Sequence, residues 1–440
     1  MDMTIKSDGN SRKKIFIFSL LFMGLSHILF LKQYIKGILF ALCEIVFIVF
    51  LPKIINKIAD LITLGYFQPD LPITQRDNSI FMLIDGVMVL AIILLFVIMY
   101  AISSKSAISE YKEFCEVKNF KDSRSSLSSI IGKSFPIVAL APTVVLIIFF
   151  VLVPLIFAAL IAFTNYSSPN NIPPKNTVDW VGLKNFVDLF GGQATWTSAL
   201  GRVAVWTLVW AFLATTTCYF GGLIMAAVLN ESKIKIKPFF RSIFILPYAI
   251  PSVVSMLVWQ NLLNGSFGTI NRTLMQLGII KTVIPWLSDQ WLAKFVCIAI
   301  NLWAGFPYFM LLALGTMTSI SQDIFEAAKI DGANAFQVFK GITFPLVMYQ
   351  TVPLMIMSFT FNLNNFGAIF FLTGGNPIMA DSTITSAKGT DILVTWIYNL
   401  TINLYKYNYA SVLAVMIFII LAPFAIFNFR RTKSYREGEL

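Results

Sequence analysis

The stretch Glu326-Ala327-Ala328-Lys329-Ile330-Asp331-Gly332 interrupts an otherwise very apolar chain with polar residues. Ser321 or Asp323 can cap the start of a short helix here, and Gly332 can adopt the left-handed conformation that ends it. Further on, Ile342-Thr343-Phe344-Pro345 begins the next apolar run, with a proline suited to the first turn of a helix. We therefore expect a polar loop with short helices between two long apolar segments.

A second short helix is expected after Asn334, which can cap it. This helix carries Phe336 and Phe339 at i, i+3, so the two rings share one face and form an apolar knob on a polar loop. A knob of this kind needs a socket on a partner protein. The alternative is a helical hairpin that lies at the membrane interface.

Composition places the chain in a lipid bilayer. Of its 440 residues, 57% are hydrophobic and 12% are charged, and the mean hydropathy is +0.76. These values indicate an all-α, polytopic membrane protein rather than a globular domain. The net charge of +11 does not indicate nucleic-acid binding, because the basic residues form short blocks beside apolar segments, as the positive-inside rule expects.

The cysteines and the single histidine indicate neither a metal site nor an enzyme. Cys43, Cys115, Cys218 and Cys297 have no ligand spacing and are interpreted as small apolar fillers, so no disulfide framework, metal or cofactor is implied. A membrane-embedded enzyme would need a nucleophile–base pair or a metal site, which one histidine does not readily supply. No small-residue cleavage site ends the first apolar region, so we expect that region to be retained.

Apolar runs occur at 15–31, 37–52, 80–102, 136–163, 202–230, 239–263, 291–317, 345–372 and 409–429. Crossing a hydrocarbon core about 30 Å thick takes roughly 20 helical residues, and the runs from 80 onward are long enough. The basic blocks at 12–14, 112–133, 233–237 and 430–436 and the polar loop fall on one side if each run from 136 crosses once. Both termini are then cytoplasmic, and the number of crossings is even.

The run 15–31 is the weakest spanning candidate, because it contains Ser26 and His27. We assign it to an interfacial or re-entrant helix, which leaves about eight spans. The alternative is that 15–31 spans and that 37–52, which is short and contains Glu44, does not. The predicted division is a membrane region at 1–102, a cytoplasmic linker at 103–135, a six-span core at 136–430 with the polar loop at 318–345, and a cytoplasmic tail at 431–440.

Charged residues are nearly absent from the predicted core spans. An ion-coupled carrier needs such groups there, because moving charge across a membrane requires side chains that bind it. Arg202, Arg241 and Lys294 lie only near span ends, so coupling to an ion gradient is not expected. Glu44 and Asp85 are exceptions in the N-terminal pair of spans. Each is either a buried pairing or signalling group, or a carboxylate near a span end or a wet cleft.

Neutral polar, small and aromatic residues form helical stripes on three core spans. The stripes are Asn301, Ala304, Gly305 and Tyr308; Ser358, Phe361, Asn362 and Asn365; and the i, i+4 pair Tyr248 and Ser252 behind the helix breaker Pro247. Amides and hydroxyls beside flat rings suit a neutral polyol such as a sugar. The alternative is that the polar groups bond between helices while the small residues allow close packing.

The polar loop resembles the "EAA" loop through which the membrane subunits of ABC importers contact their ATPases. The family spacing is Glu-Ala-Ala, three residues, Gly, nine residues and Ile-x-Leu-Pro, and it is matched except that Phe344 replaces Leu. The resemblance implies an ATPase-coupling element that comprises Glu326, Ala327, Ala328, Gly332, Phe336, Phe339 and Pro345. In that element Glu326 would contact the ATPase through charge, Gly332 would supply the bend, and the two phenylalanines would fill the socket.

Longer runs resemble the F-type permease subunit of maltose/maltodextrin ABC importers over roughly residues 136–430. They are Leu246-Pro247-Tyr248-Ala249-Ile250-Pro251-Ser252, Asn264-Gly265-Ser266-Phe267-Gly268, Asn301-Leu302-Trp303-Ala304-Gly305-Phe306-Pro307-Tyr308, Phe361-Asn362-Leu363-Asn364-Asn365-Phe366 and Leu372-Thr373-Gly374-Gly375-Asn376-Pro377. The resemblance implies a type I ABC importer transmembrane fold. It also implies sugar contacts at Tyr248, Ser252, Asn301, Ala304, Gly305, Tyr308, Ser358, Phe361, Asn362, Asn365 and Gly367. Ala304 and Gly367 replace a Leu and a Val of the family pattern, which leaves room for longer oligosaccharides or a shifted pose.

The resemblance implies a non-enzymatic permease that moves maltodextrins by alternating access. Its implied partners are a sister permease in a heterodimer, two ATPase subunits and an extracellular solute-binding protein. ATP hydrolysis would occur on the ATPases, since this chain has no G-x-x-x-x-G-K-[ST] loop. A permease for another neutral oligosaccharide or polyol, or for glycerol phosphate, is the alternative, and an ion-coupled secondary carrier is a more distant one.

The loop that follows the span 136–163 is short. Enterobacterial relatives insert a large folded domain there, whereas residues 164–201 of this chain can form a small cap at most. We therefore expect the cell membrane of a bacterium without a periplasm, in which a lipid-anchored binding protein is kept nearby by other means.

Overall fold

The computed structural model describes residues 9–117, 135–230 and 236–431. Their regular secondary structure is helical, with two isolated β-bridges between residues 164 and 180. The chain divides into two compact units, Met1–Val181 and Gly182–Leu440, called here the N-terminal and C-terminal units. Residues 118–134 of the predicted linker, the basic residues at 233 and 235, and almost all of the predicted tail lie outside the described residues.

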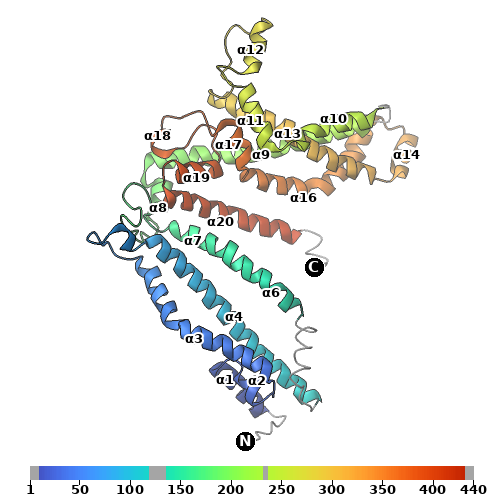
Figure 1. The fold of residues 1–440 in the computed structure, drawn as a ribbon. Coiled ribbons are helices and arrows are strands. Elements are labelled where there is room, and N and C mark those ends of the chain that lie inside the picture. Colours follow the sequence, from blue (N-terminus) through green and yellow to red (C-terminus); the bar gives the residue numbers. More distant parts are fainter. Residues whose placement is uncertain (1–8, 118–134, 231–235, 432–440) are drawn as a thin grey trace. The chain divides into compact units, whose positions relative to one another are not determined.

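The N-terminal unit is built around two long helices that pack side by side, α3 and α4 (Figure 1). Its elements are α1 (Gly9–Leu21), α2 (Leu25–Leu29), α3 (Tyr34–Thr63), η1 (Ile73–Gln75), α4 (Ser79–Val117), α6 (Phe135–Ile147), the π-helical turn η2 (Ile148–Leu152) and α7 (Val153–Ile161). Helix α7 packs against α4. The span predicted at 136–163 therefore packs with the two spans that precede it in the chain. The domain boundary predicted at 135/136 stays a prediction.

The first apolar run is bent and does not form one continuous helix. Gly24 separates α1 from α2 with a φ of 81°, and a Cβ placed on it would lie 2.1 Å from the carbonyl oxygen of Gly37. The buried carboxylate of Glu44 accepts a hydrogen bond from the amide of Met23 at this bend. Because α3 has 30 residues and is long and apolar enough to span, the structure favours 37–52 over 15–31 as the first crossing.

Helix α4 is longer than the sequence predicts. Residues 103–117, which we expected to begin the linker, continue it as helix. This extension is anchored to the segments before it, because His27 Nε2 lies 3.3 Å from Ser106 Oγ and Lys36 Nζ lies 3.3 Å from Glu110 Oε1. Serine, lysine and glutamate favour a linker only where nothing packs against them.

The C-terminal unit contains the remaining helices. They are α8 (Lys184–Val187), η3 (Asp188–Gly192), α9 (Ala194–Asn230), α10 (Lys237–Ala249), α11 (Ser252–Leu262), α12 (Thr269–Gln276), α13 (Gln290–Thr318), α14 (Gln322–Ile330), α15 (Ala335–Val338), η4 (Phe339–Thr343), α16 (Phe344–Leu363), α17 (Phe366–Thr373), α18 (Ser382–Thr385), α19 (Leu393–Ile402) and α20 (Tyr407–Arg431). The described residues hold seven helices long and apolar enough to cross a membrane, or eight spans if α10 and α11 cross as one. The prediction of an all-α polytopic fold with about eight spans is confirmed.

Two predicted spans are broken rather than continuous. Helices α10 and α11 meet at a bend of 87°, because Ile250 before Pro251 is extended, with a ψ of 132°. The break therefore falls at Pro251, whereas Pro247, the predicted breaker, lies inside α10. The run 345–372 is likewise divided, because α16 ends at Leu363 and Asn365 caps α17 by accepting a hydrogen bond from the amide of Ala368.

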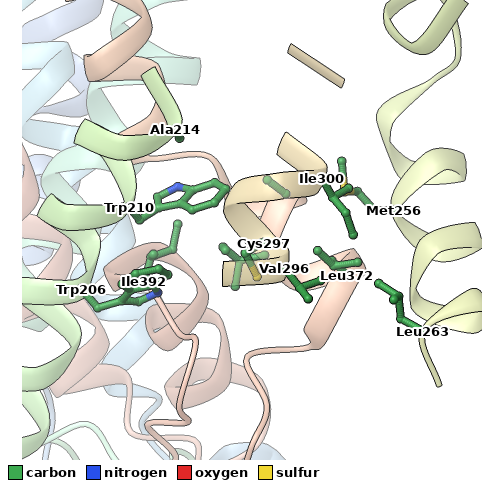
Figure 2. Packing of buried hydrophobic residues seen from close by; sticks show 12 residues of the cluster. Trp206, Trp210, Ala214, Met256, Leu263, Val296, Cys297, Ile300, Leu372 and Ile392 are labelled. Atoms are coloured by element: carbon green, nitrogen blue, oxygen red, sulfur yellow. The ribbon is translucent and has the colours of Figure 1, made fainter. Parts of the chain in front are cut away.

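The core of the C-terminal unit joins α9, α11, α13 and α17. Figure 2 shows Trp206 and Trp210 of α9 on one side, Met256 of α11 on the other, and Cys297 of α13 with Leu372 of α17 between them. Inside a membrane such packing gains little from leaving water, so van der Waals contact and hydrogen bonds hold the helices together. The indole Nε1 of Trp210 donates to the main-chain oxygen of Asn362 at 3.1 Å, which ties α9 to the end of α16.

Candidate functional site

A cavity of about 400 Å³ lies among α9, α10, α13, α16 and the cap of α17, and we call it the central cavity. Its lining residues are Cys218, Tyr248, Asn301, Gly305, Tyr308, Phe309, Leu354, Met357, Ser358, Phe361, Asn362 and Asn365. None of them is charged. The volume lies within the range of pockets that hold small ligands, which is about 300–1,000 Å³.

Helix α13 supplies the first wall. It runs unbroken through Pro307, so Asn301, Gly305 and Tyr308 lie on one face, as their spacing predicts. The ring of Tyr308 lies 6.1 Å from that of Tyr248 on α10, measured between centroids. The cavity therefore has a pair of aromatic rings beside an amide.

Helix α16 supplies the second wall through Ser358, Phe361 and Asn362. The buried amide of Asn362 donates to Thr215 Oγ1 at 3.1 Å, and its Oδ1 accepts from Asn365 Nδ2 at 3.4 Å. Asn362 thus both lines the cavity and bonds α16 to α9, so the interhelical alternative is confirmed for this residue while its sugar contact stays a prediction. Asn365 reaches the cavity as the cap of α17 rather than as part of one helical stripe.

Three of the predicted sugar-contact residues do not line the cavity. Ser252 lies beyond the bend at Pro251, so its i, i+4 relation to Tyr248 is lost. Ala304, about 60° from Asn301 around the helix, packs instead against the core cluster. Gly367 lies in α17, where an added Cβ would face the ring of Phe371 at 3.6 Å.

Sequence analysis missed Cys218, Phe309, Leu354 and Met357 as lining residues. Cys218 was interpreted as an apolar filler, yet its Sγ donates to the main-chain oxygen of Asn301 at 3.3 Å and lies 3.4 Å from Asn301 Nδ2. A Cβ on Gly305 would lie 2.8 Å from the same sulfur. Gly305 therefore allows α13 to approach α9, which is the close-packing role that was the alternative for the small residues of this stripe.

The 318–345 segment is held together by its own backbone and caps. Helix α14 has Asp323 in its first turn and Lys329 in its last, as the helix dipole favours. The helix ends at Ile330 and is followed by Gly332 in the left-handed conformation, with a φ of 75°, and the amide of Ala333 donates to Ala328 O at 2.9 Å. Asn334 and Gln337 then form a reciprocal capping box on α15. The predicted roles of Gly332 and Asn334 in the local structure are confirmed.

The exposed apolar surface of this segment differs from the predicted pair. Phe336 is 71% exposed, but Phe339 packs against the cluster beneath it and lies 6.1 Å from the ring of Phe344. Ile330, at the end of α14, is 87% exposed. Glu326 and Ala327 are exposed, Ala328 is buried, and Pro345 stands in the first turn of α16. Ile330 and Phe336 are thus the two most exposed large apolar side chains of the segment and are called here the exposed pair. Ile324 is 42% exposed, and Phe339 begins the π-helical turn that leads into α16.

Comparison with known proteins identifies the family. Residues 218–432 match the family described as "Binding-protein-dependent transport system inner membrane component". The chain is 35% identical to the galactooligosaccharides transport system permease protein GanP of Bacillus subtilis, over 92% of this chain and 94% of that protein. It is also 35% identical to the maltodextrin transport system permease protein MalC of Streptococcus pneumoniae, over 92% of each chain.

The fold has solved counterparts. A crystal structure of a bacterial ABC transporter involved in the import of the acidic polysaccharide alginate matches with a TM-score of 0.55 and 22% identity, over 70% of this chain and all of that chain. This likeness supports the transmembrane architecture of an ABC importer. Since relatives at 35% identity are covered over more than nine-tenths of their length, the chain belongs to the family of binding-protein-dependent transport system inner membrane components, the membrane-spanning permeases of ABC importers.

Proposed function

We propose that this permease binds maltodextrins in the central cavity and passes them across the cell membrane by alternating access. The observation that carries the proposal is the lining: Asn301, Ser358 and Asn362 offer amide and hydroxyl groups, rings flank them, and no charged side chain is among the lining residues. Sugar hydroxyls need such partners, and the C–H faces of a sugar ring pack on aromatic rings. The maltodextrin permease MalC of Streptococcus pneumoniae and MdxF of Bacillus subtilis, at 35% and 31% identity, support this choice of substrate.

Galactooligosaccharides are the second candidate substrate. GanP of Bacillus subtilis is as similar to this chain as MalC, and its printed name assigns it to those sugars. Both sugar classes are neutral oligosaccharides, so a neutral cavity lined with amides suits either. The two differ in linkage and therefore in the directions of their hydroxyl groups.

Energy for transport would come from two ATPase subunits that contact the 318–345 segment. The exposed pair Ile330 and Phe336 would enter a socket on the ATPase, with Glu326 and the other predicted coupling residues around it. This chain lacks a G-x-x-x-x-G-K-[ST] loop, so we assign hydrolysis to the ATPases. A sister permease would complete the translocation path as the other half of a heterodimer.

The segment that contacts the ATPases must lie in the cytoplasm, which fixes the proposed orientation. Both termini are then cytoplasmic, as the basic blocks also favour. An extracellular solute-binding protein would deliver the sugar from the opposite side. The short 164–201 loop supports a host without a periplasm.

A competition panel tests the substrate. Uptake of labelled maltodextrin is measured in cells that express the complete transporter, with unlabelled maltodextrins, galactooligosaccharides and glycerol phosphate as competitors. We expect maltodextrins to compete at the lowest concentration. Stronger competition by galactooligosaccharides would replace the first candidate with the second, and uptake that persists after ATP depletion would contradict an ABC importer.

A pair of variants tests the coupling segment. Gly332→Val forces a β-branched residue into a left-handed conformation, which costs about 1–2 kcal/mol although the surrounding space is open. Gly332→Asn, which tolerates this conformation, is the matched control. We expect the first variant to reach the membrane but to lose ATPase association and uptake, and the second to keep both. Equal uptake by the two variants would argue against the docking role.

A further inference from the structure

A second cavity of about 490 Å³ lies in the C-terminal unit, and we call it the terminal cavity. It lies between the end of α11, the loop that precedes α13 and the end of α17. Its lining residues include Gln260, Asn264, Phe267, Ser288, Leu372 and Asn376. None of them was predicted as a sugar contact.

The same helices border both cavities. Asn365, the cap of α17, lines the central cavity, and Leu372 near the other end of α17 lines the terminal cavity. The eight residues of α17 span about 12 Å. Helix α13 gives a similar separation between the two cavities. Its first residue, Gln290, follows the loop that holds Ser288 of the terminal cavity, and Asn301 of the central cavity lies about 16 Å further along the helix axis.

The spacing between the cavities is fixed by packing. Helix α17 packs along α11, and both belong to the core cluster with α13 (Figure 2). Leu372 is 1% exposed and is a member of that cluster as well as a lining residue. The packed helices therefore hold the two cavities at a fixed distance, and a ligand long enough to reach from one to the other would contact both.

The terminal cavity repeats the chemistry of the central one. Gln260 and Asn376 bring amides, Ser288 brings a hydroxyl, and none of the lining residues is charged. Among the described residues, no hydrogen bond engages the side-chain amide of Gln260. The ring of Phe267 is 59% exposed, and its position is set by Asn264, whose Oδ1 accepts hydrogen bonds from the amides of Ser266 and Phe267.

The terminal cavity lies toward the beginning of α13, whereas the 318–345 segment follows the end of the same helix. If that segment contacts the ATPases, the terminal cavity lies on the side from which sugar arrives. Figure 1 shows α14 beyond one end of this helical group, and α12 standing away from the group beyond α11.

We propose that the terminal cavity is an outer saccharide subsite, which holds the far end of an oligosaccharide whose leading end occupies the central cavity. This inference rests on the proposed function and adds to it a determinant of chain length. Short sugars fill the central cavity alone, and longer ones gain contacts with Gln260 and Phe267.

The test compares chain lengths in the complete transporter, with its binding protein and ATPases present. KM is measured for maltose and for long maltodextrins in the unaltered protein, in Gln260→Ala and in Phe267→Leu. Loss of one hydrogen bond or one ring contact corresponds to about a fivefold change. We expect each substitution to raise KM for long maltodextrins about fivefold more than KM for maltose. The matched control is Gln276→Ala, the same chemical change at an exposed position of α12 that lines neither cavity.

The outcomes separate this inference from the proposed function. If the substitutions change KM equally for maltose and long maltodextrins, or leave KM unchanged, the outer subsite is overturned. The proposed function still stands in that case if the unaltered protein takes up the sugar. An equal loss at both lengths, accompanied by weaker stimulation of ATPase activity by the binding protein, would assign the cavity to protein docking. If the unaltered transporter takes up no maltodextrin or galactooligosaccharide, the proposed function fails and the subsite fails with it.

Discussion

The two units of this permease differ in where they place charged side chains. In the N-terminal unit, charges lie on the spanning helices and pair with one another: Lys57 Nζ lies 2.9 Å from Asp85 Oδ2, and Lys36 pairs with Glu110. In the C-terminal unit the central cavity has an entirely uncharged lining. Its Arg202 binds both carboxylate oxygens of Asp381 at 2.7 Å, away from that lining.

This difference separates two roles: the charged side chains of the N-terminal unit hold helices together, whereas the uncharged lining of the central cavity suits a neutral ligand. We call this the separation of structural charge from functional neutrality. A charge on a spanning helix needs a partner, and in the N-terminal unit the partner is a residue of a neighbouring helix, so each pair links two elements. An oligosaccharide, in contrast, replaces water around its hydroxyls with amides and rings, and an unpaired charge in the same cavity would have to lose its own water. The neutral lining of the central cavity therefore contrasts with the paired charges of the N-terminal unit, and substitutions that change either one test this contrast.

The largest effect is expected from a charge placed in the central cavity. Asn301→Asp puts a carboxylate in the middle of α13 with no basic residue among the lining, which costs about 3 kcal/mol on the scale for a helix centre. The corresponding loss in kcat/KM for sugar uptake is about a hundredfold. Asn301→Gln, which keeps the amide, is the control and should lose much less. Normal uptake by the aspartate variant would show that neutrality of the lining is not required.

A smaller effect is expected from filling the contact between α13 and α9. Gly305→Ala places a methyl group 2.8 Å from Cys218 Sγ, and overpacking of this kind costs about 1–3 kcal/mol. Thermal unfolding of the purified transporter should show the loss, and Cys218→Ala should restore much of it, because the sulfur is the nearest obstacle. Gly315→Ala on the same helix, with open space around it, is the control and should not destabilise. If Cys218→Ala does not restore the stability lost in Gly305→Ala, the packing role assigned to Gly305 is wrong.

Sequence patterns predicted the cavity best where a helix runs unbroken. Asn301, Gly305 and Tyr308 line it because α13 is continuous, so the helical repeat applies. Ser252 fails because the chain bends at Pro251, and a bend of 87° invalidates any i, i+4 relation across it. Asn365 lines the cavity although the predicted reason was wrong, since a cap of α17 takes the place of the last turn of a longer helix.

A stripe of residues on one helix does not show which residues of another helix lie against it. Roles that depend on such a neighbouring helix could therefore not be predicted from the stripes. Cys218 meets Asn301 only because α9 lies against α13, and Phe339 is half-buried only because residues of α9, α13 and α16 form a cluster against which it packs. Glu44, for which pairing and a wet cleft were both considered, binds the amide of Met23 across a bend that the sequence did not locate. In each case the partner is distant in sequence or lies beyond a backbone irregularity.

A pH effect is expected outside the spans, in the loop before α19. Asp391 is 1% exposed, and burial raises its pKa, although the amide of Lys388 and the side chains of Thr395 and Asn399 donate hydrogen bonds to it. Because the folded state holds this proton more tightly than the unfolded state, the stabilisation is greatest below the ordinary pKa of aspartate and is lost as pH rises through the raised value.

Thermal unfolding of the transporter over a pH series measures this effect. We expect the melting temperature to rise as the pH falls through the raised pKa of Asp391 toward the ordinary pKa of aspartate, and Asp391→Asn to reduce that dependence because asparagine does not titrate. Asp70→Asn, at an exposed loop position, should leave the dependence unchanged. An unaltered pH profile in Asp391→Asn would mean that other groups produce the slope.

The smallest effect is expected from the charge pair of the N-terminal unit. The side chains of Lys57 and Asp85 are 42% and 39% exposed, so their ion pair contributes about 0–1 kcal/mol, and Asp60 at 3.6 Å gives Lys57 a second partner. Asp85→Ala should therefore lower stability slightly and leave KM for sugar unchanged. Lys57→Asp together with Asp85→Lys should recover part of what either single reversal loses, because opposite charges again face each other between α3 and α4. If Asp85→Ala instead changed KM as strongly as a substitution in the central cavity, charge in the N-terminal unit would share in substrate binding, and the separation of structural charge from functional neutrality would fail.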